Sequence, residues 1–216
     1  MPSPTVENYL KALLKLSTQE GKTTASALAR HLAVSTPTVN SMVRRLAEQG
    51  LVHYEKYQPL TLTEEGRKAA ALIVRKHRLT EMFLVEKMGF GWEEVHAIAE
   101  QIEHVQSPAF FARMDELMGY PTKDPHGSPI PSPEGDIAAS PTLRLSDCPV
   151  GRTVRLIGLD HSSNEFLHLL NDRELHLRTE LTVVAREVFD GSVTVRYGGR
   201  GREVFSRVVA ERLLVG

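Results

Sequence analysis

Hydrophobic and polar positions follow two different periods along the chain, and the change of period divides the sequence into a helical part and a β part. In residues 5–16 the apolar side chains recur at helical spacing and form one stripe, made up of Val6, Tyr9, Leu10, Leu13 and Leu14. The opposite face of this helix carries Glu7, Asn8, Lys11 and Lys15. Beyond residue 141 the apolar runs become short and alternate, which is typical of strands.

Capping residues predict where the other helices begin and end. Thr24 is placed to cap a short helix that runs through Leu32, and Ser35 is placed to cap the next one. That helix runs to about Gln49, and Gly50 is its stop signal. Three further helices are expected over residues 63–88, 92–107 and 109–118.

Two short strands around a turn at Gln58-Pro59 are expected in "LVHYEKYQPLTL". A helix, a tight turn and a second helix, followed by such strands, predict a winged helix-turn-helix. Near the C-terminus, "RTVRLIGL", "ELTVVARE" and "SVTVRYGG" predict strands of a small β-barrel, with one short helix near 164–170. Residues 121–141 hold six Pro and are predicted to be a linker.

These elements predict a mainly α protein with a small β domain. We expect a winged helix-turn-helix in residues 1–72, an α-helical domain with the Pro-rich linker in 73–141, and the β domain in 142–216. A length of 216 residues, 41% hydrophobic and 25% charged, suits compact units of this size.

The composition also indicates the compartment. No apolar run is long enough to span a membrane, and "MPSPTVENYL" lacks the pattern of a signal peptide, so the chain is expected to be neither secreted nor membrane-bound. Cys148 is the only cysteine, which excludes an internal disulfide and a thiolate-rich zinc site. A lone cysteine fits a reducing cytoplasm, the location we expect.

Charge is unevenly distributed, although the net charge is only −1. Residues 1–60 carry seven Lys and Arg against four Asp and Glu, whereas residues 81–104 carry six Glu against one Lys. This distribution favours nucleic acid as a partner of the first segment and cations as ligands of the second.

The second helix of the helix-turn-helix presents polar side chains where a recognition helix meets DNA. Short hydroxyls and an amide suit bases or phosphates, and two arginines suit phosphates. The candidate DNA-binding residues are Ser35, Thr36, Pro37, Thr38, Asn40, Ser41, Arg44 and Arg45. A merely solvated polar face on an amphipathic helix pair is the alternative interpretation.

Histidines and glutamates gather at helical spacing in the middle of the chain. His77 and Glu81 are four residues apart, and a second predicted helix places four more side chains within about 100° of one face, namely His96, Glu100, Glu103 and His104. Imidazole and carboxylate groups in this arrangement suit a divalent cation with nitrogen and oxygen ligands. The alternative is again a solvated polar face.

A loop histidine adds a further candidate. His126 stands beside Asp124 in "KDPHG", where it is either another ligand or a hydrogen-bonding group. Other histidines without carboxylates at ligand spacing are expected to be structural or exposed, namely His31, His53, His168 and His176.

Several motifs resemble the diphtheria-toxin-repressor family of iron- and manganese-dependent regulators. They are "STPTV", "RKHRLTEMFL", "VHAIAEQIEHV" and "GSPIP", and the resemblance covers essentially the whole chain. The segment "LSDCPVGRTVRLIGL" looks like the SH3-like domain that many members share with ferrous-transport accessory proteins. The resemblance implies a homodimer formed largely through the middle domain, with metal sites between that domain and the first helix.

The resemblance also implies ligand sets. One site would use Glu100, Glu103 and His104 with a first-helix ligand at Asn8, where the family has Met or Asp. Manganese members lacking the third domain often have Glu at the position of Lys11, so paired metals are not expected here.

A second site implied by the resemblance would use His77, Glu81 and His96, with Glu165 or Asp160 from the SH3-like domain. In a manganese-responsive subgroup a Cys-Pro-His linker motif contributes. This chain offers Asp124 and His126 in that motif.

Iron-type members carry Cys at the position of Glu100, and manganese-type members carry Glu, so the expected cofactor is Mn2+, with Fe2+ second. Metal would tie the first helix to the middle domain and set the spacing of two recognition helices on double-stranded DNA, at a palindromic operator with half-sites about one turn apart. The implied output is repression of metal-uptake genes.

Two alternatives remain open on the sequence. One is a winged-helix regulator without metal control. The other is a dimetal hydrolase, which is disfavoured because no additional nucleophile or general base stands out.

Overall fold

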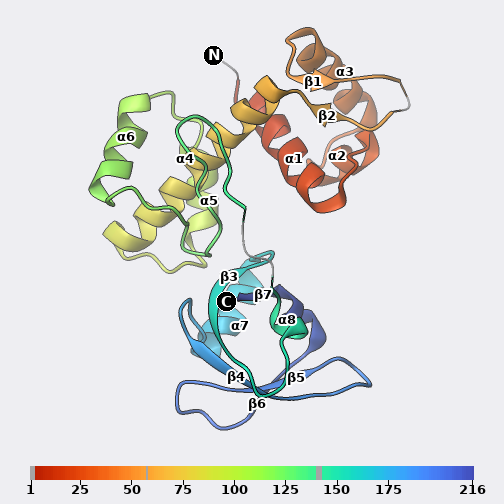
Figure 1. Cartoon of the computed structure of the whole chain (residues 1–216). Helices are drawn as coiled ribbons and strands as arrows, with labels where there is room; N and C mark the ends of the chain where they lie inside the picture. The colour runs from red at the N-terminus through yellow and green to blue at the C-terminus, as the bar shows by residue number, and fades with distance from the viewer. Residues whose placement is uncertain (1–2, 57, 140–142) are drawn as a thin grey trace. The chain divides into compact units, whose positions relative to one another are not determined.

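The computed structural model describes residues 3–56, 58–139 and 143–216 (Figure 1). It divides into two compact units that interleave along the sequence. Unit 1 comprises Met1–Thr80, Ile98–Tyr120 and Ile130–Ala138, and unit 2 comprises Glu81–Ala97, Pro121–Pro129 and Ala139–Gly216. The three domains drawn from the sequence stay a prediction, and the expected boundary between residues 141 and 142 lies outside the described residues.

Unit 1 begins with the elements of a winged helix. They are α1 (Pro4–Glu20), α2 (Ala25–His31), α3 (Thr36–Glu48), and the antiparallel pair β1 (Val52–His53) and β2 (Thr61–Leu62). The first helix begins one residue before the predicted segment, where the Ser3 hydroxyl caps it and Pro4 occupies its first turn. It ends four residues beyond that segment, at Glu20, and Gly21 follows with a φ of 70°.

The predicted caps of α2 and α3 are confirmed. Thr24 Oγ1 accepts a hydrogen bond from the Ala27 amide at 3.1 Å, and Ser35 Oγ accepts one from the Thr38 amide at 3.3 Å. Gly50 follows α3 with a φ of 74°, a conformation that favours glycine.

The apolar stripe of α1 is part of the core of the winged helix. Leu10 and Leu13 are buried with Leu28 of α2, and this cluster continues into α3 and the wing with Val39, Val43, Leu46, Val52 and Leu60. The apolar face of α1 is therefore buried against α2 and α3, and its polar face is available for other contacts.

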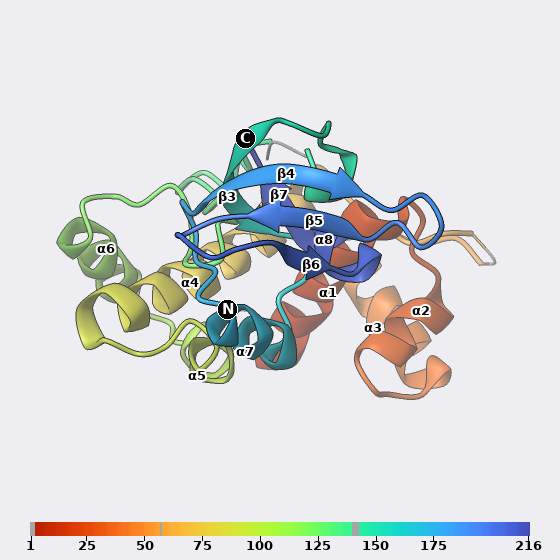
Figure 2. The ribbon, with the colours of Figure 1, turned by 90° about the horizontal axis from the view of Figure 1, so that it is seen from below.

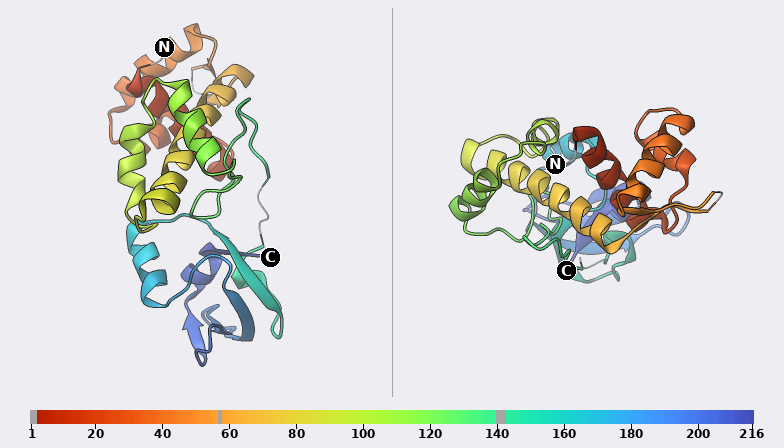
Figure 3. Two further views of the ribbon diagram at one scale, coloured as in Figure 1. Left: turned by 90° about the vertical axis from the view of Figure 1, so that its left-hand side faces the viewer. Right: turned by 90° about the horizontal axis from the view of Figure 1, so that it is seen from above.

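Three helices follow, namely α4 (Glu64–Met88), α5 (Val95–Ile102) and α6 (Pro108–Leu117). Figure 3 shows α4 as one long, unbroken helix. The expectation for α4 is confirmed, and α6 begins one residue earlier than expected. No helix in the parts of the chain that the structure describes is both long and apolar enough to cross a bilayer.

The helix expected over residues 92–107 is shorter at both ends. Before it, the Glu94 amide donates to the Gly91 carbonyl oxygen at 3.0 Å and closes a turn. After it, Glu103 and His104 lie in a turn beyond Ile102. The expectation that these two side chains share one helix with His96 is therefore wrong, although the Glu103 amide still donates to the Ala99 carbonyl oxygen at 2.9 Å.

The described part of the Pro-rich linker follows defined turns. The Asp124 amide donates to the Ser128 carbonyl oxygen at 2.9 Å. Within this turn Gly127 has a φ of 86°, and a Cβ there would lie 2.4 Å from the Ile157 carbonyl oxygen. Glycine therefore lets the linker approach the backbone at Ile157 closely.

Unit 2 contains an antiparallel five-stranded sheet in the described residues, ordered β6-β5-β4-β3-β7 (Figure 2). Its strands are β3 (Thr153–Leu159), β4 (Glu180–Arg186), β5 (Val193–Arg196), β6 (Glu203–Phe205) and β7 (Leu213–Val215). The short helical elements are η1 (Leu145–Asp147), α7 (Asn164–Asp172) and α8 (Arg207–Arg212). The three strands expected from the sequence are confirmed.

The sheet encloses its own apolar core, which includes Leu156, Leu181, Val195 and Phe205 from the strands and Leu170 from α7. Strands β6 and β7 form the two edges and are connected through α8. Among the described residues these edges do not pair with each other, so the hydrogen-bonded sheet is open, in an SH3-like arrangement.

Candidate metal centre and DNA-binding surface

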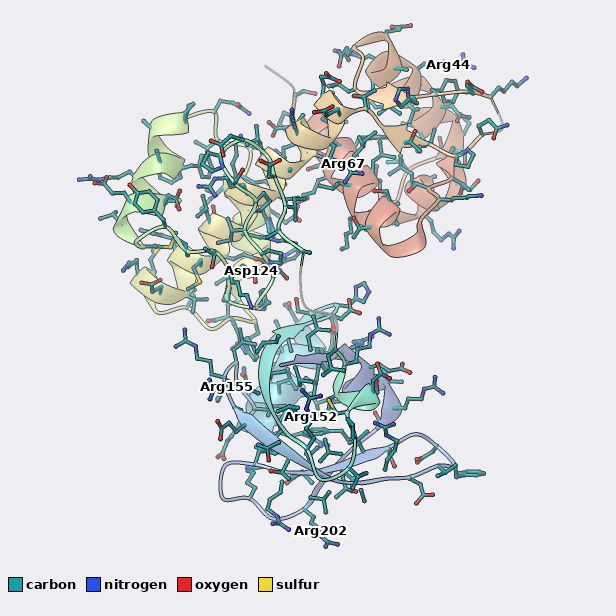
Figure 4. All side chains as sticks on the ribbon, in the orientation of Figure 1. Arg44, Arg67, Asp124, Arg152, Arg155 and Arg202 are labelled. Carbon is teal, nitrogen blue, oxygen red and sulfur yellow. The ribbon has the colours of Figure 1, made fainter. Side chains whose placement is uncertain are left out.

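The exposed side of α3 carries most of the predicted DNA-binding residues. An open hollow of about 600 Å³ is lined by Pro37, Asn40, Ser41, Arg44, Arg45 and Glu48. Arg44, labelled in Figure 4, has its guanidinium 6.0 Å from the centre of the Tyr54 ring beyond β1. This cation–π contact holds the Arg44 side chain near the residue after β1, and a contact of Arg44 with a DNA phosphate stays a prediction.

Some predicted DNA-binding hydroxyls also hold the helix together. Ser35 caps α3, and its hydroxyl lies 2.7 Å from that of Thr38. Both side chains belong to exposed residues, and Thr36 is half-buried. Contacts of these three residues with DNA stay a prediction.

The polar face of α1 meets the turn after α5, and the residues gathered there form what we call the helix centre. Its members are Glu7, Lys11, His77, Glu100, Glu103 and His104, all within unit 1, and Asn8 lies between Glu7 and Lys11 in the sequence of α1. The structure thus brings four of the predicted ligands, His77, Glu100, Glu103 and His104, together with Glu7 and Lys11, two α1 residues that the sequence placed on a polar face.

Glu103 lies at the middle of the helix centre and is fully buried. Its Oε1 is 2.6 Å from Lys11 Nζ, and its Oε2 is 2.5 Å from His77 Nδ1. Glu103 Oε1 is also 3.8 Å from His104 Nε2, and Glu100 Oε1 is 2.7 Å from Lys11 Nζ. Both carboxylate oxygens of Glu103 are therefore in contact with nitrogen atoms of the centre.

Glu7 is a residue of the helix centre that the sequence prediction did not include among the candidate site residues. Its side chain is buried, and its Oε2 lies 2.6 Å from His104 Nδ1. Gln106 Nε2 donates to Glu7 Oε1 at 2.9 Å and fixes the carboxylate. A carboxylate on one imidazole nitrogen orients the other toward a metal, so Glu7 directs His104 Nε2 into the centre. The i,i+4 spacing of Glu7 and Lys11 was a signal of a shared face.

The side-chain oxygen of Asn8 bears on whether this part of the molecule is suited to a cation. Its Oδ1 is buried and has no hydrogen-bond partner within the described residues. A buried acceptor without a donor costs free energy, and a divalent ion bound there would supply the missing partner. The side chains at hand offer oxygen and nitrogen ligands only, so the helix centre fits a divalent cation.

A second group, which we call the linker centre, lies within unit 2. Ligand atoms of Glu81, Asp124 and His126 lie within 4.8 Å of one another, and all three residues are buried. His96 adds its Nδ1 at 3.2 Å from Glu81 Oε1, although its side chain is 61% exposed. Figure 4 labels Asp124 on the linker.

The linker centre is joined to the β domain through Trp92, the only tryptophan of the chain. His126 stacks on the Trp92 ring with 6.0 Å between ring centres, and His126 Nε2 is 2.9 Å from the Trp92 carbonyl oxygen. Trp92 Nε1 donates to Asn171 Oδ1 at 2.7 Å, and Asn171 Nδ2 donates to Glu93 Oε2 at 3.0 Å. A shift of His126 on binding metal would therefore alter the contacts of Trp92, and through Trp92 those of Asn171 on α7.

The two ligands considered from the SH3-like domain have other contacts. Asp160 Oδ2 accepts from Arg144 at 3.1 Å. Hydrogen bonds from its own backbone amide and from the Ser163 hydroxyl hold the pKa of the exposed Glu165 carboxyl below its ordinary value, which is typical of a helix-capping carboxylate. Neither residue belongs to a group with metal-ligand geometry in the described part of the chain. Their role as ligands stays a prediction, as does a site formed by His77 with Glu81 and His96.

Helix α1 shares a core with the recognition helix α3, and its polar face lines the helix centre. This combination is that of a metal-controlled DNA-binding protein. Residues 1–60 match the family model "Iron dependent repressor, N-terminal DNA binding domain", and residues 63–132 match "Iron dependent repressor, metal binding and dimerisation domain". Residues 143–216 match the FeoA domain. The chain belongs to the iron-dependent repressor family, whose members are DNA-binding transcriptional repressors and not enzymes, so the hydrolase alternative is set aside.

Individual relatives agree with this assignment. The chain is 38% identical over 161 residues to the iron-dependent repressor IdeR of Mycobacterium tuberculosis, covering 71% of this chain and 70% of the relative. It is 31% identical over 212 residues to the diphtheria toxin repressor of Corynebacterium diphtheriae, covering 93% and 92%. A solved structure described as a manganese-dependent transcriptional repressor in complex with manganese matches with a TM-score of 0.85 at 34% identity, covering 97% and 98%.

Proposed function

We propose that this chain is a repressor that prefers Mn2+ over Fe2+, binds a palindromic operator as a homodimer in the cytoplasm, and represses genes for metal uptake. The helix centre would hold the activating ion through Glu103, His104, Glu100 and Asn8. The linker centre would hold a second ion through Glu81, Asp124 and His126, with His96.

One observation carries the proposal. Helix α1 contributes its apolar face, including Leu10 and Leu13, to the core of the winged helix, and its polar face, including Glu7 and Lys11, to the helix centre. An ion there would bind α1 to the turn after α5 and restrict where the recognition helix lies. Metal binding would thus shift the conformational population of the chain toward states in which the recognition helix is positioned to bind DNA.

The preference for Mn2+ is supported by ligand chemistry. Within the described residues, both centres offer carboxylate, amide and imidazole groups, which suit hard and borderline ions. The only thiol, Cys148, lies in the sheet core with its pKa raised by burial, so it contributes no soft ligand. The similarity to a manganese-bound repressor supports the same metal.

The homodimer is supported by the matched dimerisation domain and by apolar side chains on and after α6. Phe110, Leu117 and Tyr120 are 41%, 53% and 67% exposed, so this surface would be covered in a dimer. Two copies related by a two-fold axis present two recognition helices, which is why we propose an operator with inverted half-sites.

The experiment that tests the proposal is a DNA-affinity measurement on the wild-type chain. Duplexes selected from a random pool in the presence of Mn2+ should contain an inverted repeat. Anaerobic titration should then raise affinity for that duplex by at least about tenfold, with Mn2+ acting at lower concentration than Fe2+. Equal affinity with and without metal would favour the winged-helix regulator without metal control, and selected sites without symmetry would contradict the palindromic operator.

Occupation of the linker centre should be visible in the fluorescence of Trp92. We expect Mn2+ to quench it in the wild-type chain, because a paramagnetic ion held by His126 would lie next to the stacked indole ring. In His126→Ala the quenching should need at least about tenfold more Mn2+, since a ligand is lost. His53→Ala, which alters an exposed histidine on β1, is the control. Identical quenching curves for His126→Ala and the control would rule out His126 as a ligand.

A further inference from the structure

The outer face of the SH3-like sheet carries a row of polar side chains that crosses four strands. Thr153 of β3 lies opposite Thr182 of β4, which in turn lies opposite Arg196 of β5. Strands β5 and β6 pair antiparallel, and continuing their register by one residue places Arg202 opposite Arg196. The neighbouring residues on these strands belong to the apolar core, so the row lies on the side of the sheet that faces solvent.

The two arginines of this row lack a counter-charge. Arg196 and Arg202 are exposed, and neither has a carboxylate within salt-bridge distance among the residues that the structure describes. The carboxylate next to Arg202 in the sequence is occupied, because Glu203 lies 3.6 Å from an Arg200 nitrogen and 3.8 Å from an Arg173 nitrogen. The positive charge of Arg196 and Arg202 is therefore not neutralised within the sheet.

The row has the chemistry of a phosphate-binding surface. Like charges directly opposite on neighbouring strands repel each other, and an anion bound between Arg196 and Arg202 would remove that repulsion. Guanidinium groups bind phosphate oxygens through two parallel N–H donors. Beside them, Thr153 Oγ1 and Thr182 Oγ1 lie 3.0 Å apart. Only one of the two hydroxyl protons is used in that contact, so the other can be donated to a phosphate oxygen.

The exposure of the row favours a polyanion over a small anion. A single ion on an open sheet surface would be held weakly, because solvent and salt screen exposed charges. A polyanion that the same molecule already holds elsewhere is present at a high effective concentration, so weak contacts then add to its affinity. Residues 1–60 match the DNA-binding domain of the family, so duplex DNA is such a polyanion.

We propose that the outer face of the SH3-like sheet is a second, sequence-independent contact for duplex DNA. Arg196 and Arg202 bind backbone phosphates, and the adjacent threonine pair, Thr153 and Thr182, donates a hydrogen bond to them. Since phosphates are the same in every sequence, this surface adds affinity without adding specificity. The inference goes beyond the proposed function, because it needs DNA binding but neither a preference for Mn2+ nor a palindromic operator.

The test is the salt dependence of DNA binding by the full chain. Affinity for a random-sequence duplex that extends well beyond a winged-helix site is measured over a series of KCl concentrations at one fixed Mn2+ concentration. Each neutralised phosphate contributes about 0.9 to the slope of log affinity against log salt, so the double variant Arg196→Gln, Arg202→Gln should have a slope smaller by about 1.8. A slope equal to that of the wild-type chain overturns the proposal.

Two further variants show whether the effect belongs to this row. The double variant Arg144→Gln, Arg207→Gln removes the same charge from two exposed arginines that are paired with Asp160 and Glu211, and it should keep the wild-type slope. An equal loss of slope in this control overturns the proposal, because net charge alone would explain the result. Replacing Arg196 and Arg202 with Lys should restore most of the slope, since lysine also neutralises phosphate.

An anionic lipid surface is the competing partner, and vesicles containing phosphatidylglycerol provide that arm of the test. Co-sedimentation of the wild-type chain that is lost in Arg196→Gln, Arg202→Gln, together with an unchanged DNA slope, overturns the proposal in favour of a lipid. Failure of the proposed function has a different signature. The wild-type chain would then show no response of DNA affinity to Mn2+, whereas the difference in slope between the wild-type chain and the variant would persist.

Discussion

Replacement of Glu103 with Gln is expected to abolish the stimulation of DNA binding by Mn2+. The Glu103 carboxylate is fully buried and touches both Lys11 and His77, and it lies 3.8 Å from His104 Nε2. The amide is nearly the same size but carries no charge and offers one oxygen instead of two. Mn2+ affinity should fall by about 100-fold or more, since loss of a ligand exceeds loss of an outer partner.

Two measurements on Glu103→Gln separate the metal effect from a folding defect. Circular dichroism should show the wild-type helical content, because Lys11 retains its contact with Glu100. Glu65→Gln, an exposed residue in the first turn of α4, makes the same chemical change and should leave the metal response intact. A Glu103→Gln protein that responds to Mn2+ at the wild-type concentration would remove Glu103 from the activating site.

Local sequence signals were sufficient to predict the helices of the winged helix. The stripe through Leu10 and Leu13 is a periodic signal, and the caps at Thr24 and Ser35 act over three residues. Both kinds of signal are contained in a short segment, so no knowledge of distant contacts is needed to interpret them.

The partners of the polar face of α1 could not be predicted in the same way. Lys11 contacts Glu100 across 89 residues of sequence, and Glu7 contacts His104 across 97. An amphipathic pattern shows which face is polar but not what that face touches. The sequence therefore indicated a charged face at Glu7 and Lys11. It did not show that Glu7 contacts His104 or that Lys11 contacts Glu100 and Glu103.

Two other features could not be predicted from the sequence, namely the shortest strands and the residue at which helix α5 ends. Strands β6 and β7 contain three residues each, too few to show an alternating pattern. Helix α5 ends at Ile102 although "VHAIAEQIEHV" continues the helical period through Val105. The turn matters for the site, because it is where Glu103 and His104 lie.

Asn8 is expected to couple metal binding to DNA affinity, and two substitutions test this in opposite directions. Its Oδ1 is buried without a hydrogen-bond partner in the described residues, on the helix whose apolar face belongs to the winged-helix core. Asn8→Asp adds a negative charge at this position and should raise Mn2+ affinity by about tenfold, because a charged oxygen binds a divalent ion more strongly than a neutral one. Asn164→Asp, at an exposed position of α7, repeats the chemical change and should not alter the affinity.

Asn8→Ala should give a different signature. Glu103 and His104 remain as ligands, so Mn2+ affinity should fall only modestly, by up to about tenfold. The gain in DNA affinity on adding Mn2+ should fall further, because the ion no longer holds α1. Since Oδ1 makes no hydrogen bond in the described residues, the metal-free variant should unfold at no lower temperature than the wild-type chain. Metal affinity and metal-induced DNA affinity that decline in parallel, or both stay at the wild-type value, would show that another group on α1 provides the coupling.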